Sequence, residues 1–417
     1  MKKLIRKIIA KENNPLAFLI SEGFSKIISF LAVPYFVNLL DKDAFGELSL
    51  YWISVPIFSI FVDLSTRSYI KKIYFDDNVK IKNVLTAHNY LSIITLLILV
   101  LFYGFFNILL GWTIVSKTID LYILVNAFLY AVIENYMSFL QIKGNSNKYS
   151  VVFALRNGSP YIITAIIFSS SWIDIKVFPI VQAAVYGLIF IWVIYKGFAI
   201  ISVKTIYKLI VKGLKFSLPI LPSMISSISL IYIDRFLIKY YYSTQEVAEY
   251  TVAYVIASLV PMVFNATGKW WQTFLFKELK ENNKFKILKI FKLYALIIIA
   301  LAVFIVVFRT QFVLLMSNKE YLKVADIIPV LIIGMIFQFL YTSSINVPFY
   351  YGKTSLFIIP SISAFVINLV LNIILIPIIG YKAAALTTAI AYFVEFGIIY
   401  IINISRFGIN LFSFKYR

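Results

Sequence analysis

The sequence predicts an all-α integral membrane protein with about twelve transmembrane helices, each about 20 residues long. Of the 417 residues, 61% are hydrophobic and only 14% are charged, whereas a soluble domain has about 45–50% apolar and about 25% charged residues. The apolar residues form long continuous runs, and this disfavours a lipid-facing β-barrel, whose strands alternate. The runs follow one another along the whole chain with short connections, so we expect no separate soluble domain.

Each predicted span is a run of about 20 or more mostly apolar residues, the length that a helix needs to cross a bilayer. The first run follows a basic N-terminal stretch but is too long for the core of a signal peptide, so we expect it to be retained. The predicted spans are residues 15–40, 45–66, 84–110, 119–141, 149–170, 176–200, 216–239, 245–268, 288–316, 324–349, 354–379 and 383–405.

The distribution of basic residues predicts the topology. The chain has 39 Lys and Arg against 19 Asp and Glu, a net charge of +20. Most of the basic residues lie at the two termini and in every second connection. Because basic residues collect on the cytoplasmic side, we expect both termini in the cytoplasm and an even number of spans. The positive charge then reflects topology, and we expect no nucleic acid as a partner.

Two features indicate a division into halves. The segment 201–215 has four lysines spaced three or four residues apart, which predicts an amphipathic basic helix on the inner leaflet. The sequence GELSL at 46–50 is followed, close to half a chain length later, by the similar AEYTV at 248–252. We therefore expect an N-terminal lobe (1–200, helices 1–6), a cytoplasmic linker (201–215) and a C-terminal lobe (216–417, helices 7–12), with the substrate site between the repeats.

The composition also narrows the chemistry. The chain has no cysteine and one histidine, which excludes disulfides, thiolate metal sites and histidine clusters. It has no glycine-rich phosphate-binding loop before a helix, so we expect no nucleotide hydrolysis. The sequence thus predicts no metal, no cofactor and no enzymatic activity.

Three stretches carry a resemblance to a known family. They are DKDAFGELSLYWISVPIFSIFVDL at 41–64, LKFSLPILPSMISSISLIYIDRFLI at 214–238 continuing into VAEYTVAYVIASLV at 247–260, and NLVLNIILIPIIGYKAAALTTAIAY at 368–392. The chain resembles the polysaccharide transporter family, whose best-known members are O-antigen (Wzx-type) flippases of the multidrug/oligosaccharidyl-lipid/polysaccharide exporter superfamily. It departs from the family at Lys382 and at Leu64-Ser65, where glycine is frequent.

The resemblance implies two six-helix lobes around a central cavity with alternating access to the two sides of the membrane. It implies a flippase that moves undecaprenyl-pyrophosphate-linked oligosaccharide units, of O-antigen, lipopolysaccharide or a related surface polysaccharide, from the cytoplasmic to the periplasmic leaflet. It places the protein in a bacterial cytoplasmic (inner) membrane. The expected partners are the lipid-linked glycan, the bilayer, and the polysaccharide polymerase and chain-length regulator of the same pathway.

A flippase for such a lipid needs a cavity with fixed positive charge, although a charge at mid-bilayer costs about 2.5–3.5 kcal/mol. At 1.5 Å per residue, Lys26 lies about 16 Å and Arg156 about 10 Å into the membrane from the cytoplasmic end of its span. We expect both cations to line the cavity and to contact pyrophosphate or sugar hydroxyls. Glu22 lies four residues before Lys26 on the same helix face, and either lines the cavity or pairs with Lys26.

Other charged residues in the spans have two interpretations each. Asp234 and Arg235 match the family's Asp-Arg pair; Arg235 lines an outer vestibule, or the pair lies at the outer interface. Glu134 and Glu395 lie deep in the fourth and twelfth spans, where buried carboxylates often carry coupling ions. For Glu134 the alternative is a structural pair with Arg156.

Alternative functions have different requirements. A multidrug or cation antiporter of the same superfamily needs an anionic site, and the deep cations Lys26 and Arg156 argue against one. An oligosaccharide polymerase typically has a large basic outer loop, which this sequence lacks. A peptidoglycan-precursor flippase usually has two more helices than we count.

Overall fold

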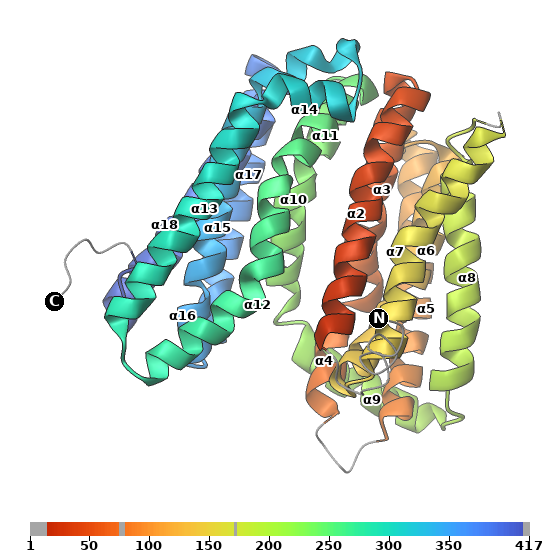
Figure 1. Ribbon diagram of the computed structural model, residues 1–417. Coiled ribbons are helices and arrows are strands. Elements are labelled where there is room, and N and C mark those ends of the chain that lie inside the picture. Colours follow the sequence, from red (N-terminus) through yellow and green to blue (C-terminus); the bar gives the residue numbers. More distant parts are fainter. Residues whose placement is uncertain (1–14, 75–79, 171–172, 412–417) are drawn as a thin grey trace, which may run out of the picture. The chain divides into compact units, whose positions relative to one another are not determined.

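The computed structural model describes residues 15–74, 80–170 and 173–411, with side chains from residue 27 onward except that of Thr354. Its regular elements are all helices, and these ranges contain no strand (Figure 1). The predicted all-α fold is therefore confirmed. Contacts divide the chain into a first unit, Met1–Phe36 with Glu47–Ile225, and a second unit, Val37–Gly46 with Ser226–Arg417. The lobe and linker boundaries expected from the sequence remain a prediction.

The helices of the first part of the chain follow the predicted spans to within a few residues. The predicted amphipathic segment forms one further helix, α9. The bounds are α2 (Pro15–Leu39), α3 (Lys42–Asp63), α4 (Arg67–Ile73), α5 (Ile81–Leu110), α6 (Lys117–Ile142), α7 (Ser146–Ser169), α8 (Val177–Gly197) and α9 (Val203–Ser217).

The second part has more helix breaks than the sequence predicts, because three predicted spans are each made of two pieces. Two short 3-10 helices, η1 and η2, complete it. The bounds are α10 (Leu221–Tyr241), α11 (Thr244–Ala257), α12 (Leu259–Lys280), α13 (Lys284–Val307), α14 (Arg309–Met316), η1 (Lys319–Asp326), α15 (Ile328–Ser344), α16 (Asn346–Tyr350), η2 (Thr354–Phe357), α17 (Ile358–Ile379) and α18 (Ala383–Phe407).

Ten described helical segments are long and apolar enough to cross a membrane, and the bent pair α11 and α12 gives an eleventh. Helix α2 is 25 residues long, and its segment Ile27–Leu39 is apolar. Helix α5 exposes Leu101 at 74% and Ile108 at 84%, as a surface that faces lipid would. The chain is a multi-pass membrane protein.

A bend of 42° separates α11 from α12 at Ser258. The sequence predicts one span that ends at residue 268, but α12 continues to Lys280. Proline lacks the N–H that would bond to the carbonyl four residues earlier. Pro261 therefore leaves the carbonyl of Ala257 without its helical donor, and α11 ends at Ala257.

Each unit has its own helical core. In the first unit α6 packs against α4, α5, α7 and α8, and α9 packs against α4 and α5. The four lysines of α9 are exposed, while Leu209 and Gly213 are buried, so α9 is the amphipathic helix that the sequence predicts. In the second unit α18 packs against α15 and α17, and α15 also contacts α11, α12 and α13.

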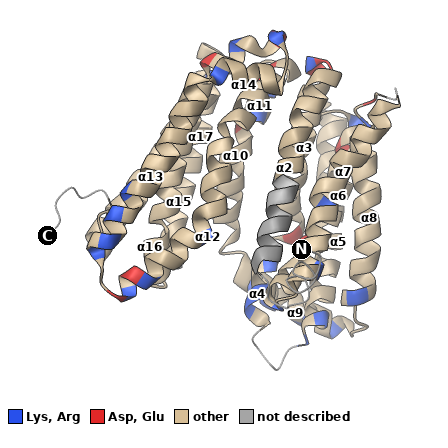
Figure 2. Cartoon of the chain, in the orientation of Figure 1, with Lys and Arg blue, Asp and Glu red and all other residues tan. Residues whose placement is uncertain are grey.

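Charged residues lie mostly near the ends of the helices in both units (Figure 2). Lys and Arg lie on α4, near one end of α8 and along α9 in the first unit, and near one end of α13 in the second. The middles of the helices are largely uncharged, so the few charged residues buried between helices identify the candidate functional sites.

Candidate functional site

The first unit holds an ion pair between two neighbouring helices. Arg156 on α7 donates from Nη1 to Oε1 of Glu134 on α6 at 2.5 Å. Only 2% of Arg156 is exposed, and the side chain of Glu134 is 20% exposed. The structural pairing that the sequence leaves open for Glu134 is therefore present. Whether Arg156 and Glu134 also contact a substrate remains a prediction.

A second pair lies where α3 ends and α4 begins. Arg67 Nε lies 3.4 Å from Oδ2 of Asp63, one helical turn earlier in the chain. Asp63 also accepts a hydrogen bond from the backbone N–H of Ser65 at 2.7 Å. Burial opposes the charge of Arg67, but the carboxylates of Asp63 and Glu134 outweigh burial and raise its pKa. Arg67 thus stays a cation next to the first pair.

Lys71, one turn further along α4, adds a third cation. Burial lowers the pKa of Lys71, the carboxylate of Glu134 opposes this shift, and Arg67 adds to it. Three cations (Arg67, Lys71 and Arg156) thus interact with two carboxylates (Asp63 and Glu134). We call these five residues the charge cluster. It has one positive charge more than it has negative charges.

Two aromatic rings lie against the guanidinium of Arg156, and a proline one turn later leaves its backbone carbonyl without a helical donor. Its guanidinium lies 4.4 Å from the ring centre of Tyr130 and 5.6 Å from that of Phe153. Such contacts stabilise a desolvated cation by up to about 2 kcal/mol. Pro160, four residues later in α7, cannot donate to the carbonyl of Arg156. Nε of Arg156 is buried without a hydrogen-bond partner. The guanidinium therefore keeps one donor for a further acceptor.

A hydrogen-bonded network adjoins the charge cluster in the first unit. Tyr51 on α3 donates to Oε1 of Gln182 on α8 and accepts from Nδ2 of Asn126 on α6 at 2.8 Å. Gln182 donates in turn to the hydroxyl of Tyr186 at 2.8 Å, and Tyr186 interacts electrostatically with Arg156. The network links α3 and α6, which carry Asp63 and Glu134, to α8.

The second unit holds a buried aspartate that is fully hydrogen-bonded. Asp234 accepts hydrogen bonds from Tyr250 at 2.7 Å, Thr388 at 2.6 Å and Asn372 at 2.7 Å. Asn372 also donates to Asn368 at 3.1 Å. Asp234 is 0% exposed and lies in the interior of the second unit, and its depth in the membrane remains a prediction. These three partners lie on α11, α18 and α17, so Asp234 links α10 to three other helices of the second unit.

Arg235 is also buried, at 3% exposure, and its depth in the membrane likewise remains a prediction. Its guanidinium lies 4.3 Å from the ring centre of Tyr254, and Nε donates to Thr251 at 3.3 Å. Among the described side chains, no carboxylate lies within ion-pair distance of it. The helix interior supplies aromatic faces that compensate its charge. A vestibule role for Arg235 remains a prediction.

The remaining predicted site residues are Glu395, Glu22 and Lys26. Glu395 on α18 is 4% exposed and accepts from Ser361 on α17 at 3.2 Å. Glu22 and Lys26 belong to α2, but their side chains lie outside the described residues. Their expected contacts therefore remain predictions.

The sequence does not single out three members of the charge cluster, Asp63, Arg67 and Lys71. It marks Arg67 and Lys71 only as basic residues in a predicted cytoplasmic connection between two spans. One signal marks the place: the departure Leu64-Ser65, where the family often has glycine. Leu64 and Ser65 have φ values of 46° and 62°, a region that suits glycine. This turn brings Arg67 back to Asp63.

Among the described residues, no group of three His, Asp or Glu side chains could hold a metal ion. The guanidinium and ammonium donors of the charge cluster suit an oxyanion, because a guanidinium binds phosphate through paired hydrogen bonds. The surplus of positive charge and the unpartnered Nε of Arg156 define the candidate site.

Comparison with other proteins shows where the chain belongs. It is 23% identical over 348 residues to an uncharacterized membrane protein of Haemophilus influenzae, covering 81% of this chain and 83% of that one. It is 27% identical over 231 residues to an uncharacterized membrane protein of Methanocaldococcus jannaschii, covering 52% of this chain and 43% of that one.

Two solved structures show the same fold at low sequence identity. An inward-facing multidrug resistance MATE family transporter of the MOP superfamily is 15% identical, with a TM-score of 0.72 and coverage of 92% of this chain and 94% of that one. The lipid II flippase MurJ in an inward closed conformation is 17% identical, with a TM-score of 0.74 and coverage of 93% and 87%. The sequence profile described as polysaccharide biosynthesis protein matches residues 13–269, and the chain belongs to that family.

Proposed function

We propose that this protein is a flippase for undecaprenyl-pyrophosphate-linked oligosaccharide units of a bacterial surface polysaccharide, such as O-antigen. The observation that carries the proposal is the charge cluster, in which a buried arginine keeps a free donor and positive charge exceeds negative charge. A pyrophosphate is an anion that such a cluster would attract. Family membership and the fold support a transporter in a polysaccharide pathway.

The proposal includes a location and partners. The protein lies in the cytoplasmic (inner) membrane with both termini in the cytoplasm, because its basic residues then follow the positive-inside rule. The polysaccharide polymerase and the chain-length regulator of the pathway receive the units that it delivers. A reporter fused to the C-terminus tests the topology: activity on the outer side would contradict it.

Deletion of the gene in its host tests the function. We expect surface polysaccharide to disappear while single lipid-linked units accumulate on the cytoplasmic leaflet. Single units that accumulate on the outer leaflet would instead indicate a polymerase. Complementation with the wild-type gene and with the exposed-site variant Arg406→Ala should restore the polysaccharide, whereas Arg156→Ala should not.

The second candidate is a multidrug or cation antiporter, favoured by the fold shared with the MATE transporter. The ligand of such an antiporter is a cation, whereas the ligand of the proposed flippase is an anion. The positive surplus of the charge cluster would repel a cation and so disfavours the antiporter. A deletion strain that keeps its polysaccharide but becomes sensitive to cationic drugs would favour it, because such a protein would have exported the drugs.

A further inference from the structure

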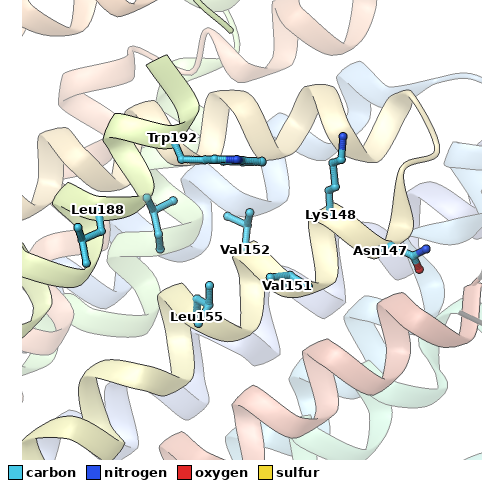
Figure 3. Close-up of a pocket in the computed structure, with 8 residues that line it drawn as sticks. Asn147, Lys148, Val151, Val152, Leu155, Leu188 and Trp192 are labelled. Atoms are coloured by element: carbon cyan, nitrogen blue, oxygen red, sulfur yellow. The ribbon is translucent and has the colours of Figure 1, made fainter. Parts of the chain in front are cut away.

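A groove runs along the surface of the first unit between α7 and α8 (Figure 3). Its volume is about 450 Å³, within the range of about 300–1,000 Å³ that is usual for small-molecule sites. The residues that line it are Asn147, Lys148, Val151, Val152, Leu155, Leu188, Ile189 and Trp192.

The groove is apolar along most of its length. Leu188 is 71% exposed and Leu155 is 48% exposed, so both present apolar side chains to the surroundings of the helices. Val152 and Ile189 are buried and form the floor. Trp192 makes an edge-to-face contact with Tyr136, with 5.4 Å between ring centres. In a membrane, such a groove is filled by a hydrocarbon chain.

A cation lies at one end of the groove. Figure 3 shows Leu188 and Leu155 toward one end and Lys148 and Asn147 toward the other. Lys148 is in the first turn of α7 and is exposed, and its ammonium group forms no ion pair with any described carboxylate. An apolar groove that ends at a free cation matches a lipid chain that ends in a phosphate.

We propose that the groove holds the part of the polyprenyl chain nearest the phosphate in the lipid-linked substrate, with the first phosphate beside Lys148. This inference rests on the proposed function. A polyprenyl lipid has a single hydrocarbon chain, which suits a single groove, whereas a diacyl phospholipid has two chains.

The groove also adjoins the charge cluster. Val152 lies one helical turn before Arg156 on α7, a rise of about 6 Å. Ile189 lies three residues after Tyr186, which interacts electrostatically with Arg156. The floor of the groove and the cation of the charge cluster thus share the same helices.

Photo-crosslinking of the purified full-length protein in lipid nanodiscs tests the groove. The probe is undecaprenyl phosphate with a diazirine on its chain. Leu155→Trp and Leu188→Trp fill the groove, and we expect each to lower labelling about tenfold, the ratio that about 1.4 kcal/mol of affinity gives. Matched controls are Ile166→Trp on α7 and Ile191→Trp on α8, which are 64% and 65% exposed and lie outside the lining; they should label like the wild type.

Lys148→Gln tests the phosphate contact. A basic residue near a membrane surface attracts an anionic lipid by about 1 kcal/mol, so labelling by undecaprenyl phosphate should fall about fivefold. Labelling by uncharged undecaprenol with the same diazirine should not change. An equal loss with both probes would overturn the phosphate contact.

Two results would overturn the groove as a polyprenyl site. One is unchanged labelling in both groove-filling variants. The other is equally strong labelling by a diazirine phosphatidylglycerol, which would make the groove an ordinary lipid contact. Because labelling needs no transport, its failure is separate from failure of the proposed function. Normal polysaccharide in the deletion strain would contradict the proposed flippase function, whereas labelling that depends on the groove would still support a polyprenyl site.

Discussion

Arg156 and Glu134 form an ion pair between α7 and α6, with Nη1 2.5 Å from Oε1, although they are separated by 22 positions in the chain. Removal of one partner from a buried pair leaves an uncompensated charge, which costs about 3–5 kcal/mol. A substitution of Arg156, which we expect to bind pyrophosphate, would therefore also lower the stability of the first unit. A test of function must separate the loss of binding from the loss of stability.

Arg156→Ala should abolish surface polysaccharide and also lower the thermal stability of the purified protein, because Glu134 loses the guanidinium with which it forms its ion pair. The double variant Arg156→Ala with Glu134→Gln removes both charges and should recover most of the stability but none of the transport. The melting temperature and the amount of protein in the membrane measure the first effect, and surface polysaccharide measures the second. Transport regained by the double variant would show that Arg156 is purely structural.

Lys26→Ala should also strongly reduce surface polysaccharide while the protein remains in the membrane, because Lys26 is the other deep cation that the sequence places in the path of the substrate. The amount of membrane-inserted protein is the internal control. Normal polysaccharide from both Lys26→Ala and Arg156→Ala would rule out a cationic cavity.

Asp234→Asn should destabilise the second unit by roughly 2 kcal/mol, since three hydrogen bonds in a membrane bundle contribute about 0.6 kcal/mol each. The amide would also turn its own N–H groups toward the donors of Tyr250, Thr388 and Asn372. Asp326→Asn, at a side chain that is 70% exposed, is the matched control and should leave the melting temperature unchanged. An equal effect of the two variants would contradict the structural role of Asp234.

Gly46→Ala should disrupt the contact between the start of α3 and the start of α11. A Cβ atom at Gly46 would lie 1.9 Å from the backbone oxygen of Thr244, which cannot move as a side chain can. Overpacking typically costs about 1–3 kcal/mol, and a backbone clash should reach the upper end. Because the chain has no natural cysteine, crosslinking of Lys42→Cys to Glu249→Cys by a bifunctional thiol reagent can report this contact; the native ammonium and carboxylate lie 3.1 Å apart.

The control for that substitution is Gly104→Ala in α5, where a new Cβ atom would meet nothing within 4 Å. Alanine is favoured over glycine in a helix by about 1 kcal/mol, so this variant should be neutral or slightly stabilising. Efficient crosslinking in the Gly46→Ala background would mean that the contact tolerates the side chain.

Ser65→Gly should stabilise the protein by about 1 kcal/mol, because a residue other than glycine in the left-handed region costs about 1–2 kcal/mol. The change also removes a buried hydroxyl that has no hydrogen-bond partner. Ser54→Gly, in the interior of α3, is the contrasting control: it loses a hydrogen bond to the carbonyl of Leu50 and should destabilise. The same sign of change in both melting temperatures would contradict the backbone argument.

Much of the fold is predictable because a spanning helix is a local feature of sequence. The run at 119–141 is found as α6 (Lys117–Ile142), and the basic segment at 201–215 is found as α9 (Val203–Ser217). The break at Ser258 is not predicted, because the apolar composition continues across it and only Pro261 marks it. The site is less predictable: Arg156 and Glu134 are visible as deep charges, but Arg67 looks like a connection residue.

The sequence by itself determined the membrane class, the places of the spans and the deep charges that need an explanation, because hydropathy and charge are properties of each segment alone. The tertiary structure decided which charges meet. Asp234 is 138 positions from Asn372 and 154 from Thr388, yet it bonds to both. Such contacts depend on how each helix is rotated and which helices pack beside it, and these are set by the burial of whole helix faces rather than by any local pattern.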